Sequence, residues 1–183
     1  MKHSDPSDLS DLFEAVSRQE AEASARPAKC FALVPCAGSG SRAGTAMPKQ
    51  YQQIAGQSMV THTLAALQSV DRLHAIAVVV SPDDVHEWPA SSVQILNCGG
   101  ATRAESVFNG LTQLLAEGAH NQDGVQATDW ILVHDAARCL ISEFEINRLI
   151  DACFDDEVGG LLALPLPDTL KAAVNGRVSQ TLP

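Results

Sequence analysis

Two kinds of hydrophobic segment alternate along the chain from residue 30 onward. Short, continuous runs of aliphatic residues predict strands that are covered on both faces of a sheet. Longer segments with apolar residues every three or four positions predict helices. The predicted strands are 31–35, 75–80, 93–98, 130–133 and 159–166, and the predicted helices are 57–70, 103–118 and 142–154, with one or two helical turns at 83–88.

Two of the predicted helices carry recognisable ends. Ser142 and Glu145 have the S-x-x-E spacing of a capping box, which predicts that a helix begins between them. Gly118 follows the last apolar position of the 103–118 segment. Glycine is common just beyond a helix because it adopts the left-handed conformation easily, so we expect Gly118 to terminate that helix.

One segment breaks the alternation of strands and helices. Residues 168–183 contain two extended runs around Asn175-Gly176, a dipeptide that strongly favours a tight hairpin turn. A two-stranded hairpin is marginally stable alone in water. The sequence therefore predicts a hairpin that packs against another surface.

Strands that alternate with helices predict an α/β fold, with a mostly parallel sheet and helices on both faces. Such sheets bind their ligands beyond the carboxyl ends of the strands. Unusual polar segments stand at those places, namely a glycine loop after 31–35, "CGGATRAES" after the strand that begins at 93, and "HDAAR" after 130–133. We therefore expect the functional site where these segments meet.

Composition narrows the class of protein. The net charge is −10, which argues against general binding of nucleic acid, since that needs a basic face. No apolar run is long enough to predict a membrane span. Five cysteines without a C-x-x-C pair indicate free thiols in a reducing compartment, and we expect a cytoplasmic location. Residues 1–29 are predicted to be an acidic, partly disordered extension, and residues 30–183 the folded domain.

The glycine loop lies within residues 33–51, "LVPCAGSGSRAGTAMPKQY". Its spacing matches neither a P-loop nor the dinucleotide-binding fingerprint. Gly38, Gly40 and Gly44 would let backbone N–H groups approach a triphosphate without a Cβ clash. Arg42 and Lys49 could add charge-assisted hydrogen bonds to the same anion.

The other two segments supply an acid, further cations and a base pocket. Asp135 ends a hydrophobic strand and offers the hard oxygen ligand that suits Mg²⁺, while Arg138 would be a second anion clamp. His134 is interpreted as structural. Gly100 permits the close approach of a flat base, and Ser106 could bind the edge of that base. Arg103 opens a helix, an unusual place for a cation, which indicates that it faces an anion or a carboxylate.

Taken together, "VPCAGSGSRAG", "PKQY", "GGATRAESV", "LVHDAAR" and "PDTLK" resemble the motifs of the 2-C-methyl-D-erythritol 4-phosphate cytidylyltransferase family over residues 30–183. The resemblance implies a Rossmann-like nucleotidyltransferase fold and a role in the non-mevalonate route to isoprenoid precursors. It implies that CTP and methylerythritol phosphate react to give the CDP-alcohol and pyrophosphate, with Mg²⁺ as cofactor.

The resemblance also implies roles for individual residues. Arg42 and Lys49 match residues that stabilise the α-phosphate during the transfer. The cytidine-contacting positions match Ala37, Gly38, Gly100 and Ser106, and the acceptor side matches Asp135, Ala136, Arg138 and Thr169. The predicted hairpin matches an arm that reaches a second subunit, which implies a homodimer.

The chain departs from the family pattern at several points. Cys139 stands where the family usually has proline, and Ala101 stands where relatives can carry an acid. Relatives also continue past the position of Pro183, so we expect a domain truncated within the arm. Two alternatives stay open at this stage: a cytidylyltransferase for another polyol phosphate such as ribitol 5-phosphate, and a CTP-binding module without activity.

Overall fold

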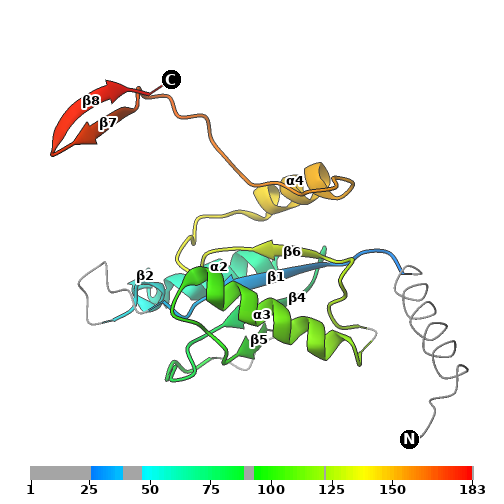
Figure 1. Ribbon diagram of the computed structural model, residues 1–183. Coiled ribbons are helices and arrows are strands. Elements are labelled where there is room, and N and C mark those ends of the chain that lie inside the picture. The colour runs from blue at the N-terminus through cyan, green and yellow to red at the C-terminus, as the bar shows by residue number, and fades with distance from the viewer. Residues whose placement is uncertain (1–25, 39–46, 89–92, 122, 183) are drawn as a thin grey trace, which may run out of the picture. The chain divides into compact units, whose positions relative to one another are not determined.

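A computed structural model describes residues 26–38, 47–88, 93–121 and 123–182. The chain forms two compact units, residues 1–147 and residues 148–183. The first unit is built on a four-stranded sheet in the order β5-β4-β1-β6, and every neighbouring pair is parallel (Figure 1). The strands are β1 (Cys30–Pro35), β4 (Leu73–Val79), β5 (Val93–Leu96) and β6 (Trp130–Val133). The prediction of an α/β fold with a parallel sheet is confirmed.

Helices cover both faces of this sheet because alternate strand residues point to opposite sides. On one face, α3 (Arg103–Gly118) places Gly110 against Leu33 and Val79 (Figure 1). The residues of opposite parity, such as Val34 and Val78, are also fully buried. Helix α2 (Met59–Gln68) contacts β4 and contributes buried apolar side chains at Val60, Leu64 and Leu67.

The start of α3 is fixed by a capping box that the sequence interpretation did not identify. The Glu105 N–H donates to Thr102 Oγ1 at 3.1 Å, and the Thr102 N–H donates to Glu105 Oε2 at 3.0 Å. These two hydrogen bonds satisfy donors that a helix leaves unpaired at its first turn. The helix therefore begins at Arg103, which places that side chain at the carboxyl edge of the sheet.

The capping box predicted at Ser142 is present. The Ser142 N–H donates to Glu145 Oε2 at 2.9 Å, and the Glu145 N–H donates to Ser142 Oγ at 3.3 Å. The helix that follows, α4 (Glu143–Cys153), runs across the boundary between the two units. Within the described part of the chain, no helix is long and apolar enough to cross a membrane.

Gly118 has a different role from the predicted one. It is the last residue of α3, and Ala119 follows it as the cap in a right-handed conformation. A Cβ atom on Gly118 would overlap the carbonyl oxygen of Val125, a core residue. The glycine is thus required by the close approach of the loop at 124–125, not by a left-handed turn.

Two predicted elements are absent. Residues 83–88 form no helix: a turn at 82–83 is followed by residues without regular structure, and Asp84 accepts hydrogen bonds from Tyr51 and Trp88. Residues 159–166 form no strand. Pro165 lacks the N–H group that a ladder needs, and most side chains of this segment are exposed.

The second unit contains the predicted hairpin. Strands β7 (Lys171–Val174) and β8 (Arg177–Thr181) pair antiparallel. Asn175 and Gly176 have φ angles of 52° and 73°, the left-handed values that a type I′ turn requires at both central positions. The prediction of an Asn-Gly hairpin is therefore confirmed.

Small elements connect β1 to α2, and none of them was predicted. A single 3-10 turn, η2, covers Lys49–Tyr51. It is followed by the short strands β2 (Gln53–Ile54) and β3 (Gln57–Ser58), which pair with each other.

The segment that precedes β1 is anchored at Asp129. The fully buried side chain of Asp129 accepts hydrogen bonds from Arg26 and from the Lys29 N–H. Residues 1–25 lie outside the described residues, so the predicted disorder of the extension and its boundary at residue 29 stay predictions.

Candidate active site

The polar segments that follow β1 and β5 meet closely at the carboxyl edge of the sheet. A Cβ atom on Gly99 would overlap the Cβ of Ala37 and lie 2.7 Å from the carbonyl oxygen of Val80. The Gly99 N–H donates to that oxygen at 2.8 Å. Glycine at this position therefore lets the backbone after β5 lie against the start of the glycine loop.

Ser106 holds the neighbouring backbone in place. Its side chain is buried, and its Oγ accepts a hydrogen bond from the Gly100 N–H at 3.1 Å and donates to Thr102 O at 3.0 Å. The first turn of α3 thus fixes Gly100. A Cβ on Gly100 would lie too close to Glu105, so this turn also requires a glycine.

Asp135 joins the segment after β6 to the start of α3. Arg103 Nε donates to Asp135 Oδ1 at 2.7 Å, and Arg138 Nε donates to Asp135 Oδ2 at 2.7 Å. Partial burial acts to raise the pKa of Asp135, but the hydrogen bonds from Arg138 and Arg103 outweigh it and lower that pKa below its ordinary value. Of the two partners predicted for Arg103, an anion or a carboxylate, the structure shows a carboxylate, and it is ionised at neutral pH.

The rest of the "HDAAR" segment is held by the backbone and by α2. Ala136 is buried, and its carbonyl oxygen accepts a hydrogen bond from Thr63 Oγ1 at 2.9 Å. His134 Nε2 lies 3.0 Å from the carbonyl oxygen of Arg138, which suits the structural role predicted for His134. These contacts leave the guanidinium groups of Arg103 and Arg138 largely exposed to solvent.

Lys49 lies in the η2 turn, and its side chain is exposed. The next residue, Gln50, is buried and binds the carbonyl oxygens of Cys36 and Gly38. The sequence interpretation did not select Gln50, although it lies inside the "PKQY" motif. The described ends of the glycine loop, 36–38 and 47–51, are therefore joined by one side chain.

Four predicted site residues are not among those described above. Gly40, Arg42 and Gly44 lie outside the described residues. Thr169 is exposed and belongs to the second unit, just before β7.

The acidic groups of the site suit one kind of metal ion. Among the described residues, no group of three or more His, Cys, Asp or Glu side chains is arranged to hold a metal. Asp135 offers a carboxylate at this edge, and both of its oxygens accept hydrogen bonds from arginines. This donor set fits an ion such as Mg²⁺, which is bound through one or two carboxylates together with phosphate oxygens and water.

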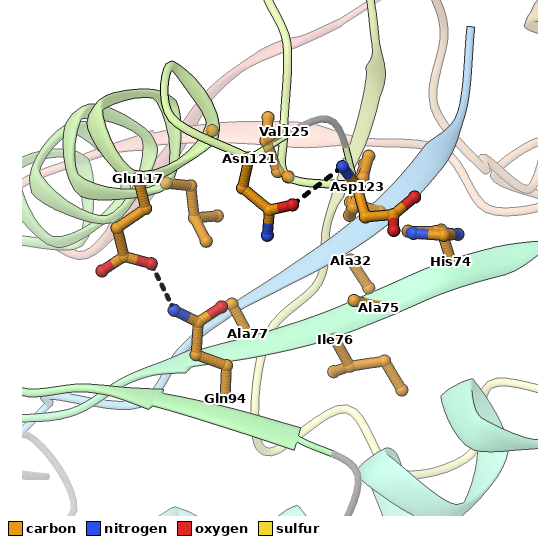
Figure 2. Close-up of a pocket in the computed structure, with 14 residues that line it drawn as sticks. Ala32, His74, Ala75, Ile76, Ala77, Gln94, Glu117, Asn121, Asp123 and Val125 are labelled. Atoms are coloured by element: carbon orange, nitrogen blue, oxygen red, sulfur yellow. Dashed lines mark hydrogen bonds between the residues drawn. The ribbon is translucent and has the colours of Figure 1, made fainter. Parts of the chain in front are cut away.

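A pocket of about 290 Å³ lies elsewhere, near the amino ends of β1 and β4 (Figure 2). Ala32, Ala75 and Val125 contribute apolar lining, and Glu117 and Asp123 contribute carboxylates. Because the convergent polar segments follow the carboxyl ends of the strands, this pocket is not part of the candidate site.

Comparison with known proteins identifies the family. The family model described as "IspD: 2-C-methyl-D-erythritol 4-phosphate cytidylyltransferase" matches residues 30–183. The chain is 51% identical over 162 residues to the 2-C-methyl-D-erythritol 4-phosphate cytidylyltransferase of Nitrosomonas eutropha, covering 85% of this chain and 67% of that protein. It is 55% identical over 158 residues to the bifunctional enzyme IspD/IspF of Albidiferax ferrireducens, covering 84% of this chain and 36% of that protein.

Solved structures agree with this assignment. A crystal structure of 4-diphosphocytidyl-2C-methyl-D-erythritol synthase superposes with a TM-score of 0.72 at 36% identity, covering 85% of this chain and 68% of that one. The IspD structure from Francisella tularensis gives a TM-score of 0.67 at 26% identity, covering 85% and 66% of the two chains. The chain spans about two thirds of the single-function relative from Nitrosomonas eutropha, and a smaller part of the bifunctional one. With the predicted fold confirmed by these structures, the chain belongs to the 2-C-methyl-D-erythritol 4-phosphate cytidylyltransferase family.

Proposed function

We propose that the protein transfers the cytidylyl group of CTP to 2-C-methyl-D-erythritol 4-phosphate, releasing pyrophosphate, as a step in isoprenoid precursor biosynthesis in the cytoplasm. The observation that carries the proposal is the convergence of the three polar segments at one edge of the sheet. Ala37 lies against Gly99, and Arg103 joins Asp135 from the next segment. Family membership supports the proposed reaction, and this geometry supports the edge of the sheet as its proposed location.

The nucleotide is proposed to lie along the segments that follow β1 and β5. Gly38 offers room for a flat base, since nothing lies within 4 Å of a Cβ built on it. Ala37 and Gly100 are proposed to contact the same base. Ser106 would act on the base through Gly100, because Ser106 Oγ accepts a hydrogen bond from the Gly100 N–H. Gly40 and Arg103 are proposed to bind the phosphates.

The transfer itself needs no protein nucleophile. A phosphate oxygen of the acceptor forms a bond to the α-phosphorus, and the bond from that phosphorus to the oxygen bridging to the β-phosphorus breaks, so pyrophosphate leaves with the electron pair. Lys49 and Arg42 would stabilise the charge that grows on the α-phosphate oxygens. Ala136, Arg138 and Thr169 are proposed to bind the acceptor, whose phosphate is an anion that a guanidinium recognises well.

Asp135 is proposed to hold Mg²⁺ together with phosphate oxygens. When bound, the ion would neutralise negative charge on the triphosphate. Asp135 would also keep Arg103 and Arg138 in place through the hydrogen bonds described above. We further propose a homodimer in which the β7-β8 hairpin serves as an arm to the second subunit, because an isolated hairpin is only marginally stable.

Release of pyrophosphate tests the proposal directly. With methylerythritol phosphate as acceptor, we expect CTP to be used about 10–100-fold more efficiently than UTP, because a pocket that hydrogen-bonds the cytosine edge leaves buried groups unpaired when uracil enters. A parallel assay with ribitol 5-phosphate distinguishes the acceptors. Equal rates with both nucleotides, or a preference for ribitol 5-phosphate, would contradict the proposed function.

Replacing Asp135 by asparagine tests the metal. Asp135→Asn keeps the shape of the side chain but removes the charge that a divalent ion needs, so we expect the Mg²⁺ concentration for half-maximal activity to rise about 10–100-fold. The matched control is Asp123→Asn, because Asp123 is exposed and lies with the pocket near the amino ends of the strands. If Asp135→Asn titrates with Mg²⁺ like the parent, Asp135 serves only to bridge the two arginines.

A further inference from the structure

Gln50 connects the two described ends of the glycine loop. Its side-chain Nε2 donates to the carbonyl oxygen of Cys36 at 2.9 Å and to that of Gly38 at 2.8 Å. Both amide hydrogens are therefore used, and the residue is only 7% exposed. A polar group buried to this degree is costly unless it is paired, so these hydrogen bonds hold the amide in one place.

The turn that contains Gln50 is fixed on its other side as well. The Tyr51 hydroxyl donates to Asp84 Oδ1 at 2.9 Å, and the ring of His86 stacks on the Tyr51 ring with centroids 4.3 Å apart. Burial raises the pKa of the Tyr51 phenol, which stays protonated and able to donate. The Tyr51 N–H also donates to Pro48 O at 3.0 Å, which closes the turn over Lys49.

Cys36 is a structural member of this cluster. Burial raises the pKa of its thiol to about 12, although the Tyr51 hydroxyl acts against that shift. The thiol is therefore protonated at neutral pH and is no nucleophile. The backbone carbonyl of Cys36, which Gln50 binds, is the part of this residue that bears on the site.

We propose that Gln50 is a positioning residue, which sets Lys49 at a fixed place relative to the backbone at 36–38. That backbone carries Ala37 and Gly38, which are proposed to contact the nucleotide, and Lys49 directly precedes Gln50. The Gln50 amide is the side chain that joins the turn to this backbone, so it would set the distance between the cation and the bound nucleotide. The inference rests on the proposed function, in which Lys49 acts at the α-phosphate. In this proposal Gln50 contacts neither CTP nor the acceptor, and it acts through Lys49, which contacts CTP.

The chemistry of the amide makes the proposal specific. Gln50→Met has a similar size but cannot donate, so the Cys36 and Gly38 carbonyls lose their partner. Gln50→Glu places a carboxylate against two carbonyl oxygens, which repel it, whereas a protonated carboxyl group can donate one hydrogen bond. The Gln50→Glu protein should therefore recover activity relative to the parent as the pH falls.

The main experiment measures kcat and KM for pyrophosphate release from CTP. We expect kcat to fall about 10–100-fold in Gln50→Met, since a misplacement of about 1 Å can have an effect of that size. Gln53→Met is the matched control, because Gln53 is exposed in β2 and should keep the parent's kcat. We also expect the ratio of Gln50→Glu to parent activity to rise at least about threefold between pH 8.5 and pH 6, as the buried carboxyl gains its proton.

A double-mutant cycle with Lys49 separates positioning from a general structural role. If Gln50 acts through Lys49, then Gln50→Met should lower kcat little further once Lys49→Ala is present. Additive losses, or an unchanged kcat in Gln50→Met, would overturn the inference. So would failure of both Gln50 variants to fold, because Gln50 would then serve folding. A parent protein that releases no pyrophosphate from CTP would instead contradict the proposed function. Thermal unfolding of the parent and of the Gln50 variants, with and without CTP, distinguishes a protein that does not fold from a folded protein that is inactive.

Discussion

Lys49→Ala should lower kcat for pyrophosphate release by about 10²–10³, the effect of removing one preorganised donor from a developing charge. The expected loss is in the chemical step, because the charge on the α-phosphate oxygens is greater in the transition state than in bound CTP. KM for CTP should change less than kcat. Steady-state assays at saturating CTP and acceptor measure the effect.

The same variant should leave folding almost unchanged. Lys49 is exposed in a surface turn, and substitutions at such places usually alter stability within about 0.5 kcal/mol. Lys29→Ala is the matched control, since Lys29 pairs with Asp123 away from the candidate site. If Lys49→Ala kept the parent's kcat, Lys49 would have no role in the proposed chemical step.

The sequence predicted the parts of the fold in which local pattern and tertiary packing agree. The apolar run at 31–35 and the helical spacing at 103–118 became β1 and α3 almost without change. The unusual position of Arg103 at a helix start predicted an anion or a carboxylate as its partner, and the structure shows the carboxylate of Asp135 there. That inference needed only the position of one cation at the start of a predicted helix.

The failures come from contacts and backbone constraints that the pattern of apolar residues does not show. Residues 83–88 follow a proline and were expected to form one or two helical turns, but Asp84 accepts a hydrogen bond from Tyr51 of another segment. The segment 159–166 is apolar like a strand, yet a strand exists only where its backbone groups find partners. Gln50 shows no hydrophobic period, so nothing in the local pattern indicates that its amide is buried against the loop at 36–38.

At Gly118, too, the local sequence pattern did not show the contact that requires the residue. Its position at the end of a helix predicted a left-handed cap, whereas the structure requires glycine because the chain at 124–125 passes directly over it. A Cβ on Gly124 would likewise lie 2.6 Å from the Cα of Gly118, so the two backbones touch. The Gln126 side chain secures the crossing with a hydrogen bond of 2.8 Å to Gly118 O.

Gly118→Ala should therefore destabilise the first unit by about 3 kcal/mol, at the upper end of what overpacking usually costs. In an ordinary helix interior the same change would stabilise by about 0.5–1 kcal/mol, so the sign of the effect is itself diagnostic. The added methyl group would meet backbone atoms of Val125, which cannot rotate away as a side chain can. Relief requires the loop to lift, and this would withdraw Val125 from the core that it shares with Phe31, Leu33 and Leu114. Thermal unfolding should show a fall in Tm of about 6–12 °C for a loss of this size in a chain of this length.

Gly38→Ala is the control, since a Cβ there meets nothing within 4 Å, and its Tm should stay near that of the parent. An unchanged or raised Tm in Gly118→Ala would mean that the loop yields freely, and that the backbone crossing does not explain the glycine.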